Sequence, residues 1–189
     1  MGIKVITASA ALLTLTELRL HLKIDTTLGV HADDTLIAAQ LTAAQEYCQH
    51  YTQQSFGDQT LELALDDFPV GGIRLPRGPV TSVVSVTYVS TASVVTTVSS
   101  ADYLLDDYGP QAWVIPAYGL DWPEPLDTVN AVKVRYQAGA ATMPGAVRAA
   151  LLLIVGHLYA NRENVSAGSL ASVPMGADAL LDIVKDWSQ

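Results

Sequence analysis

The amino-acid sequence predicts an α+β fold, a helical bundle of about four helices with an inserted small antiparallel β domain. Half of the 189 residues are hydrophobic and only 15% are charged, which is a composition that can build a packed core. Apolar residues recur every three or four positions in the first and last thirds of the chain, and every second position in between. Turn signals divide the middle third at intervals of roughly eight to fifteen residues, as in a small antiparallel sheet or sandwich.

These patterns also predict how the chain is organised. We expect residues 1–57 to contain the N-terminal helices and residues 58–138 to form the antiparallel β insertion. Residues 139–189 then supply the C-terminal helices, which pack with the first segment as one compact domain.

Two helices are expected before the β insertion. Thr14 precedes Glu17 by three residues, which is the spacing of a capping box, so a short helix begins there. A longer helix follows, capped by Asp33 or Asp34 and ending near Gln53. The apolar stripes of the two helices consist of Leu15, Leu18 and Leu22 in the first, and of Leu36, Ile37, Leu41, Ala44 and Tyr47 in the second.

The middle third alternates between apolar and polar residues, which predicts about six or seven short strands. The pattern is clearest at Leu61, Leu63 and Leu65, and in the Val- and Thr-rich segment from Val80 to Val89. The other expected strands are Ile73–Pro76, Val94–Val98, Tyr103–Leu105, Ala112–Ile115 and Val129–Tyr136.

The last third returns to helical patterns. A helix from Pro144 to about Asn161 is apolar on almost every side, so it must be covered by its own fold or by another subunit. A Ser-, Ala- and Gly-rich loop from Asn164 to Pro174 is expected to be mobile. A short amphipathic helix is then predicted from Gly176 to Trp187.

Charge and cysteine content restrict the possible functions. The formal net charge is −9 and the pI is about 4.6, which argues against broad binding of nucleic-acid phosphates. The single cysteine, Cys48, cannot form an intramolecular disulfide and is interpreted as a small helix residue. The longest uninterrupted apolar run, Ala149–Val155, is much shorter than the roughly 20 residues that span a bilayer, so we expect no membrane association. The apolar N-terminal segment is too broken by Thr and Ser for a signal peptide, so we expect no secretion.

No pattern of reactive residues points to an enzyme, a metal or a cofactor. The histidines, His21, His31, His50 and His157, have no partner at metal-ligand spacing. The carboxylate pairs could bind calcium or flank a glycosidic bond, but each stands at a predicted turn or helix cap, which favours a structural role; they are Asp33–Asp34, Asp66–Asp67 and Asp106–Asp107. We therefore expect no catalytic, cofactor-binding or metal-ligating residues.

An aromatic cluster supports a second hypothesis. Tyr103, Tyr108, Trp113, Tyr118 and Trp122 lie within twenty residues and are interspersed with prolines. Such a cluster can stack against a sugar or a peptide, or can form the local core of an irregular loop, and we favour the loop core. The alternative function is thus a small binding module that recognises a glycan or a peptide through the loop 103–122.

The order of several segments resembles the head–tail connector (adaptor) family of tailed bacteriophages, the group labelled gp6-like or phiE125 gp8-like. The segments are LTLTELRLHLKID, ADDTLIAAQLTAAQEYCQHYTQQSF, RLPRGPVTSVVSVTYVS, ADYLLDD, GLDWPEP and VKVRYQAGAATMPGAVRAALLLIVGHLYANRE. The resemblance extends from about Leu13 to Trp187, and the departures lie in loops, such as the missing Asp and Gly at Ser90–Ser93.

The resemblance implies a structural protein of the virion neck, without enzymatic activity and assembled in the cytoplasm of a bacterial host. It implies a ring of about twelve copies under the portal protein that extends the DNA channel, lets DNA pass without specific binding, and supports the next neck protein, the stopper. The expected subunit interface is Leu151, Leu152, Ile154, Val155 and Leu158. The expected portal-docking residues are Leu180, Leu181, Ile183, Val184 and Trp187.

Overall fold

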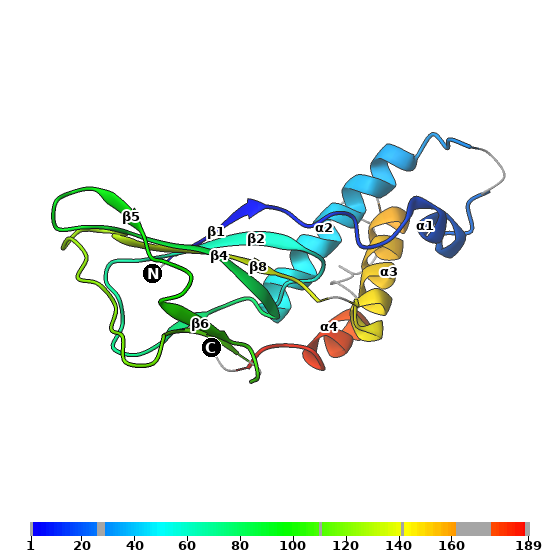
Figure 1. Ribbon diagram of the computed structural model, residues 1–189. Helices are drawn as coiled ribbons and strands as arrows, with labels where there is room; N and C mark the ends of the chain where they lie inside the picture. Colours follow the sequence, from blue (N-terminus) through cyan, green and yellow to red (C-terminus); the bar gives the residue numbers. More distant parts are fainter. Residues whose placement is uncertain (1, 26–28, 110, 141, 162–174, 188–189) are drawn as a thin grey trace. The chain divides into compact units, whose positions relative to one another are not determined.

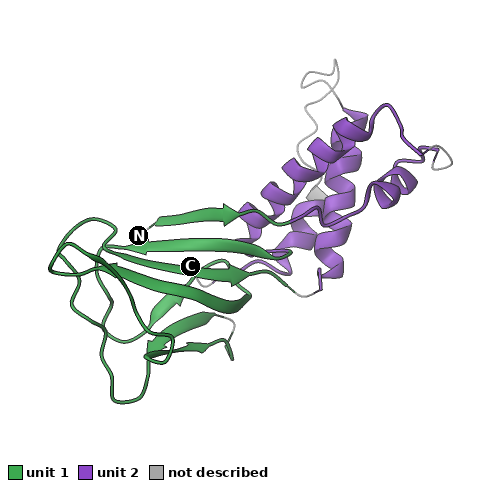
Figure 2. Cartoon of the chain, turned by 45° about the horizontal axis from the view of Figure 1, so that its top comes forward, with its two compact units in different colours: residues 1–9, 57–141 green, residues 10–56, 142–189 purple. Residues whose placement is uncertain are grey.

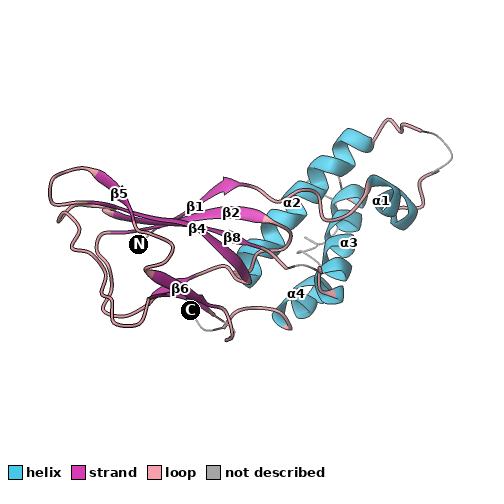
Figure 3. Ribbon diagram, in the orientation of Figure 1, coloured by secondary structure: helices cyan, strands magenta, loops and turns pink. Residues whose placement is uncertain are grey.

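The computed structural model describes residues 2–25, 29–109, 111–140, 142–161 and 175–187. Over these residues the chain forms four helices and eight strands, so the predicted α+β class is correct (Figures 1 and 3). The helices are α1 (Leu15–His21), α2 (Asp34–Thr52), α3 (Gly145–Ala160) and α4 (Met175–Asp182). The predicted mobile loop 164–174 lies outside the described residues.

The chain divides into two compact units (Figure 2). A β unit contains residues 1–9 and 57–141, and a helical unit contains residues 10–56 and 142–189. In chain order, β2 to β8 stand between α2 and α3. The first nine residues differ from our expectation, because they belong to the β unit and not to the N-terminal helices.

The β unit contains two antiparallel sheets. The larger sheet has the order β1-β2-β8-β4-β5 and the smaller sheet has the order β3-β7-β6. The strands are β1 (Gly2–Thr7), β2 (Gln59–Leu65), β3 (Ile73–Leu75), β4 (Val80–Val89), β5 (Val95–Thr97), β6 (Tyr103–Asp106), β7 (Ala112–Pro116) and β8 (Val132–Ala138). Strand β1 was not predicted, because all six of its residues are exposed and no buried face marks it as a strand in the sequence.

The alternation seen in the sequence determines the β-unit core. In the β2–β8 pair, Leu61 lies opposite Tyr136 and Leu63 lies opposite Val134, and all four side chains are fully buried. These side chains pack with Ile73, Leu75 and Val114 of the smaller sheet. The buried Tyr136 hydroxyl donates to the Pro76 carbonyl at 2.7 Å, which satisfies its hydrogen-bonding group.

The predicted capping box at the start of α1 is confirmed. The Glu17 backbone N–H donates to Thr14 Oγ1 at 3.2 Å, and the Thr14 N–H donates to Glu17 Oε2 at 2.7 Å. Leu18 is fully buried, but Leu15 of the predicted stripe is exposed, because the short helix presents only a narrow face to the core.

The start of α2 differs from the prediction, since Asp33 occupies the N-cap position but its side chain makes no capping hydrogen bond. Its carboxylate instead accepts from the Tyr159 hydroxyl of α3 at 2.6 Å. Asp34 forms an ion pair with Arg19, which lies almost completely buried on α1. The two aspartates therefore join three helices of the unit.

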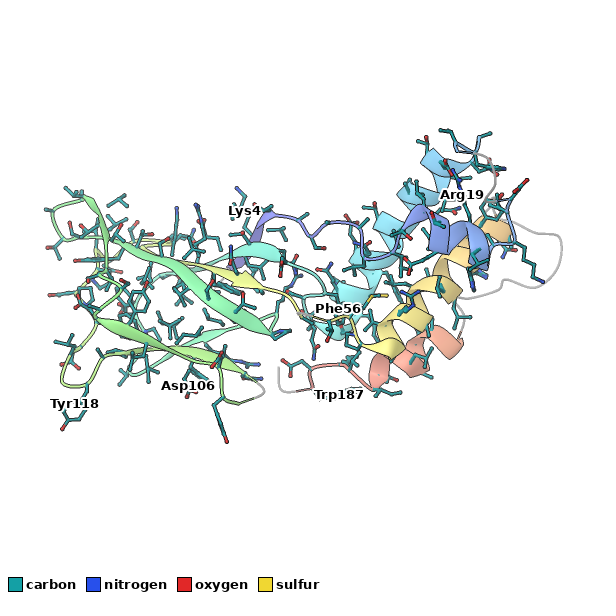
Figure 4. All side chains as sticks on the ribbon, turned by 45° about the vertical axis from the view of Figure 1, so that its right-hand side comes forward. Lys4, Arg19, Phe56, Asp106, Tyr118 and Trp187 are labelled. Carbon is teal, nitrogen blue, oxygen red and sulfur yellow. The ribbon has the colours of Figure 1, made fainter. Side chains whose placement is uncertain are left out.

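The core of the helical unit is built from one face of each helix. Its fully buried side chains include Leu18 of α1, Ile37 and Cys48 of α2, Leu151 of α3 and Leu181 of α4. Phe56, at the end of the α2 connection, completes this core and is labelled in Figure 4. Helix α4 ends at Asp182, which is shorter than the predicted helix to Trp187. The chain after it is held on α2, because the Asp186 N–H donates to the Thr52 carbonyl at 3.0 Å.

Candidate functional site

The reactive side chains of the described residues do not converge on a site. The described part of the chain contains no group of three or more His, Cys, Asp or Glu that could hold a metal ion. Asp67 and Asp106 accept local hydrogen bonds, as expected for turn residues, from the Phe68 N–H at 2.7 Å and from the Tyr108 N–H at 3.3 Å. Asp66 instead accepts from the N–H of Asn130, which is distant in sequence, at 2.8 Å. The surfaces of the two units are therefore the candidate functional features.

The predicted interface residues of α3 differ in how far the subunit itself buries them. Leu151, Ile154 and Val155 are buried in the core of the helical unit, so the subunit itself covers them. Leu152 and Leu158 are only partly buried, and both pack at the edge of this core. The exposed leucine of the helix is Leu153, with 40% of its surface accessible, which the prediction omitted. Contact with a neighbouring subunit is thus open to Leu152, Leu153 and Leu158.

The predicted docking residues divide in the same way. Leu181 is fully buried, whereas Leu180 and Val184 are partly buried against the core. Ile183 and Trp187 expose 73% and 71% of their surfaces and form the accessible apolar part of the segment (Trp187 is labelled in Figure 4). Among the five predicted docking residues, these two are the side chains that a partner can cover without disturbing the core of the unit.

A seam between α2 and α4 fixes the position of this C-terminal segment. The Tyr47 hydroxyl donates to Asp178 at 2.8 Å, and the Tyr51 hydroxyl donates to Asp182 at 2.8 Å. Burial and the hydrogen bond to Asp178 raise the pKa of Tyr47 to about 12, so Tyr47 stays protonated and can donate at neutral pH. The two tyrosines are four residues apart on α2, and the two aspartates are four residues apart on α4. Each set therefore lies on one face of its helix.

Beyond α4, Lys185 lies between two aromatic rings. Its Nζ atom is 4.5 Å from the centroid of the Tyr51 ring and 4.5 Å from that of the Trp187 ring. The sequence prediction missed this arrangement, although the repeated four-residue spacing of Tyr on α2 and Asp on α4 was a signal for the seam. The segment that carries Ile183 and Trp187 is thus ordered by contacts with its own subunit.

The aromatic residues of the loop 103–122 have different environments. Tyr103 lies on β6 and is buried in the core of the two sheets, whereas Trp122 stacks on Phe68 with ring centroids 4.9 Å apart, so both have the structural role that we favoured. Tyr108 and Tyr118 are fully exposed, and Tyr118 points away from the β unit (Figure 4). The five aromatic side chains therefore do not form one stacking platform.

The outer face of the larger sheet carries the basic residues of the β unit's strands β1 and β8. Lys133 and Arg135 alternate with buried residues along β8, and Lys4 stands opposite Glu62 in the β1–β2 register. Arg135 donates to Glu62 at 2.6 Å, so part of this charge is neutralised within the sheet. This is the pattern of a solvated strand face. Among the helices that the structure describes, none is both long and apolar enough to cross a bilayer.

Three solved structures resemble the chain over nearly its whole length, each covering 98% of this chain and 95% of the matched chain. The first, described as the neck of an empty gene transfer agent (GTA) particle computed with C6 symmetry, has a TM-score of 0.77 and 26% identity. The second, described as the virion of a native GTA particle, has a TM-score of 0.76 and 25% identity. The third, described as the neck of a native GTA particle computed with C12 symmetry, has a TM-score of 0.70 and 23% identity, and this similarity supports the fold alone.

Comparison with families and with curated proteins gives two further results. No curated protein matches the chain. The family model for phage gp6-like head–tail connector proteins matches residues 12–107, which is 96 of the 189 residues. This range includes α1, α2 and the strands β2 to β6. Because the match covers more than half of the sequence, the chain belongs to the family of phage gp6-like head–tail connector proteins.

Proposed function

We propose that this protein is a structural, non-enzymatic component of the neck of a phage or phage-like particle. In this proposal identical subunits form a ring under the portal protein, extend the DNA channel and support the next neck protein. The observation that carries the proposal is the similarity to a chain in the neck of a GTA particle, with a TM-score of 0.77 over 98% of this chain. The family match supports the same role independently.

The charge of the chain agrees with a role beside DNA. A ring that conducts DNA must not hold its phosphates, and a formal net charge of −9 disfavours such binding. Three arginines are also paired with carboxylates of the same subunit: Arg19 pairs with Asp34, Arg135 with Glu62, and Arg148 with Glu17. DNA is thus expected to pass this protein without being bound.

The accessible apolar residues of α3 and of the segment after α4 are the candidates for contacts in the assembly. Leu153, with the partly buried Leu152 and Leu158, would contact a neighbouring copy in the ring. Ile183 and Trp187 would contact the portal protein. A closed ring requires two different surfaces on each subunit that fit one another, so self-contact and portal contact need not compete for the same residues.

The docking assignment is tested by the double variant Ile183→Ser/Trp187→Ser in a binding assay with the cognate portal protein. Removing two exposed apolar side chains from a docking surface should weaken binding at least about tenfold. The matched control is Leu20→Ser on α1, because Leu20 exposes the same 73% of its surface as Ile183. If the double variant binds the portal as the control does, the C-terminal segment is not the portal contact.

A further inference from the structure

The β unit carries two adjoining grooves that share one tryptophan. The larger, of about 390 Å³, is lined by Tyr88, Val98, Leu120 and Trp122, among others. The second, of about 350 Å³, is lined by Phe68, Val70, Trp122 and Pro125, among others. Each volume lies within the roughly 300–1,000 Å³ typical of ligand sites. Leu120, at the wall of the larger groove, exposes 46% of its surface.

Trp122 is fixed in place before any ligand binds. Its ring is nearly parallel to that of Phe68, with an interplanar angle of 8° and centroids 4.9 Å apart. Its indole N–H donates to the Gly71 carbonyl at 2.7 Å. Phe68 in turn contacts the Tyr88 ring edge-on, with centroids 5.9 Å apart. A ligand that packs on Trp122 therefore orders few additional side chains and loses little binding energy to entropy.

The rim of both grooves is acidic. Asp102 and Asp121 stand at the larger groove, and Asp67, Asp121 and Glu124 at the smaller one. Residues 78–132, which include Asp102, Asp121 and Glu124 of this rim, contain six carboxylates and no Lys, Arg or His. The six carboxylates are Asp102, Asp106, Asp107, Asp121, Glu124 and Asp127.

From this combination we propose that the grooves bind a cationic, partly apolar segment of another protein. The alkyl stem of a Lys or Arg of that segment would lie along Trp122, with its charge directed to Asp102 and Asp121. Apolar neighbours in the segment would contact Leu120 and the prolines. The acidic rim disfavours nucleic acid. This inference does not depend on the place of the protein in a ring.

A second copy of this chain fits the grooves less well than a different protein. The cations of the outer sheet face, Lys4, Lys133 and Arg135, are fixed in strands of the five-stranded sheet. A flat sheet face does not present an extended segment that can enter a groove. Lys185 is placed between the rings of Tyr51 and Trp187 in the helical unit.

The proposal is tested with a capped nonapeptide, (Lys-Leu-Pro)3, and its charge-reversed analogue (Glu-Leu-Pro)3. The readout is the indole N–H resonance of Trp122 in a ¹H–¹⁵N NMR titration of the full chain. We expect saturable shifts with the cationic peptide, weakened by added salt, and none with the acidic analogue. The double variant Asp102→Asn/Asp121→Asn should weaken binding at least about tenfold.

The matched control is Asp106→Asn/Asp107→Asn, which changes the net charge by the same amount outside both grooves and should change the affinity less than about twofold. Urea midpoints establish that both variants remain folded. Equal loss of affinity in both variants would show attraction by net charge alone and overturn the proposal. So would an unshifted Trp122 resonance, an equal shift with a neutral oligosaccharide, or groove-dependent self-association of the free chain.

Discussion

Gly139, in the turn between β8 and α3, provides a sharp prediction about folding. Its φ of +144° is one that residues with a side chain rarely adopt, and its N–H donates to the Pro79 carbonyl at 2.9 Å. A Cβ atom at this position would lie 2.2 Å from the Gly57 carbonyl oxygen and 2.9 Å from the Asp58 nitrogen. These are backbone atoms, so they cannot move aside as the end of a flexible side chain can.

Gly139→Ala should therefore destabilise the β unit by two additive effects. A backbone conformation that alanine rarely adopts costs about 1–3 kcal/mol. Overpacking against the backbone at Gly57 costs about 1–3 kcal/mol more. We expect the free energy of unfolding to fall by about 2–6 kcal/mol, which is a large part of the stability of a small domain.

The measurement is urea unfolding followed by tryptophan fluorescence. In a Trp187→Phe background the remaining tryptophans, Trp113 and Trp122, both lie in the β unit and report its unfolding. The matched control is Gly2→Ala at the first residue of β1, which also belongs to the β unit and where a Cβ meets nothing within 4 Å. This control should keep or raise stability by up to about 1 kcal/mol. A loss below about 1 kcal/mol for Gly139→Ala would refute the reasoning.

Three further predictions concern the helical unit. Leu151→Ala should lower the free energy of unfolding in urea by about 2–5 kcal/mol, because Leu151 is fully buried. Leu153→Ala, on the exposed side of the same helix, should lower it by less than about 1 kcal/mol. Equal losses for the two variants would contradict the orientation of α3. Burial raises the pKa of Cys48 to about 12. A thiol reagent at about pH 8 should therefore label the native protein at least about a hundredfold more slowly than the urea-unfolded protein. Fast labelling of the native protein would contradict the burial of Cys48. The Thr14 backbone N–H and Arg148 lower the pKa of Glu17 from 4.5 to about 2. The stabilisation of the folded chain by ionised Glu17 is therefore complete above about pH 4.5 and is lost as the pH falls towards about 2. Circular dichroism of Glu17→Gln should show a smaller loss of folded protein over this pH range than the unchanged chain, and an identical loss would refute the role of Glu17.

The sequence predicted the elements that have a buried and an exposed face. β2 and β8 were recognised because every second side chain is buried, and α1 because the Thr14–Glu17 pair is a local signal. β1 was missed because its stability comes from pairing with β2 and not from a buried face of its own. The length of α4 was overestimated, because its apolar pattern continues to Trp187 after the backbone has left the helix.

The candidate assembly surfaces could be predicted only as segments. α3 is apolar on nearly all sides, so its sequence could not distinguish Leu151, which the core buries, from Leu153, which it does not. The ion pair between Arg19 and Asp34 was also not predictable, because it joins positions fifteen residues apart through the packing of α1 on α2. Side chains whose environment depends on tertiary contacts carry no periodic signal of their own.

The claim that this protein is a ring-forming neck subunit is tested most directly by electron microscopy of the purified chain mixed with its cognate portal protein. We expect closed rings of about twelve copies of this chain, coaxial with the portal ring. Portal rings that carry no density for this chain, or carry it as isolated subunits without contact between neighbours, would contradict the proposed function.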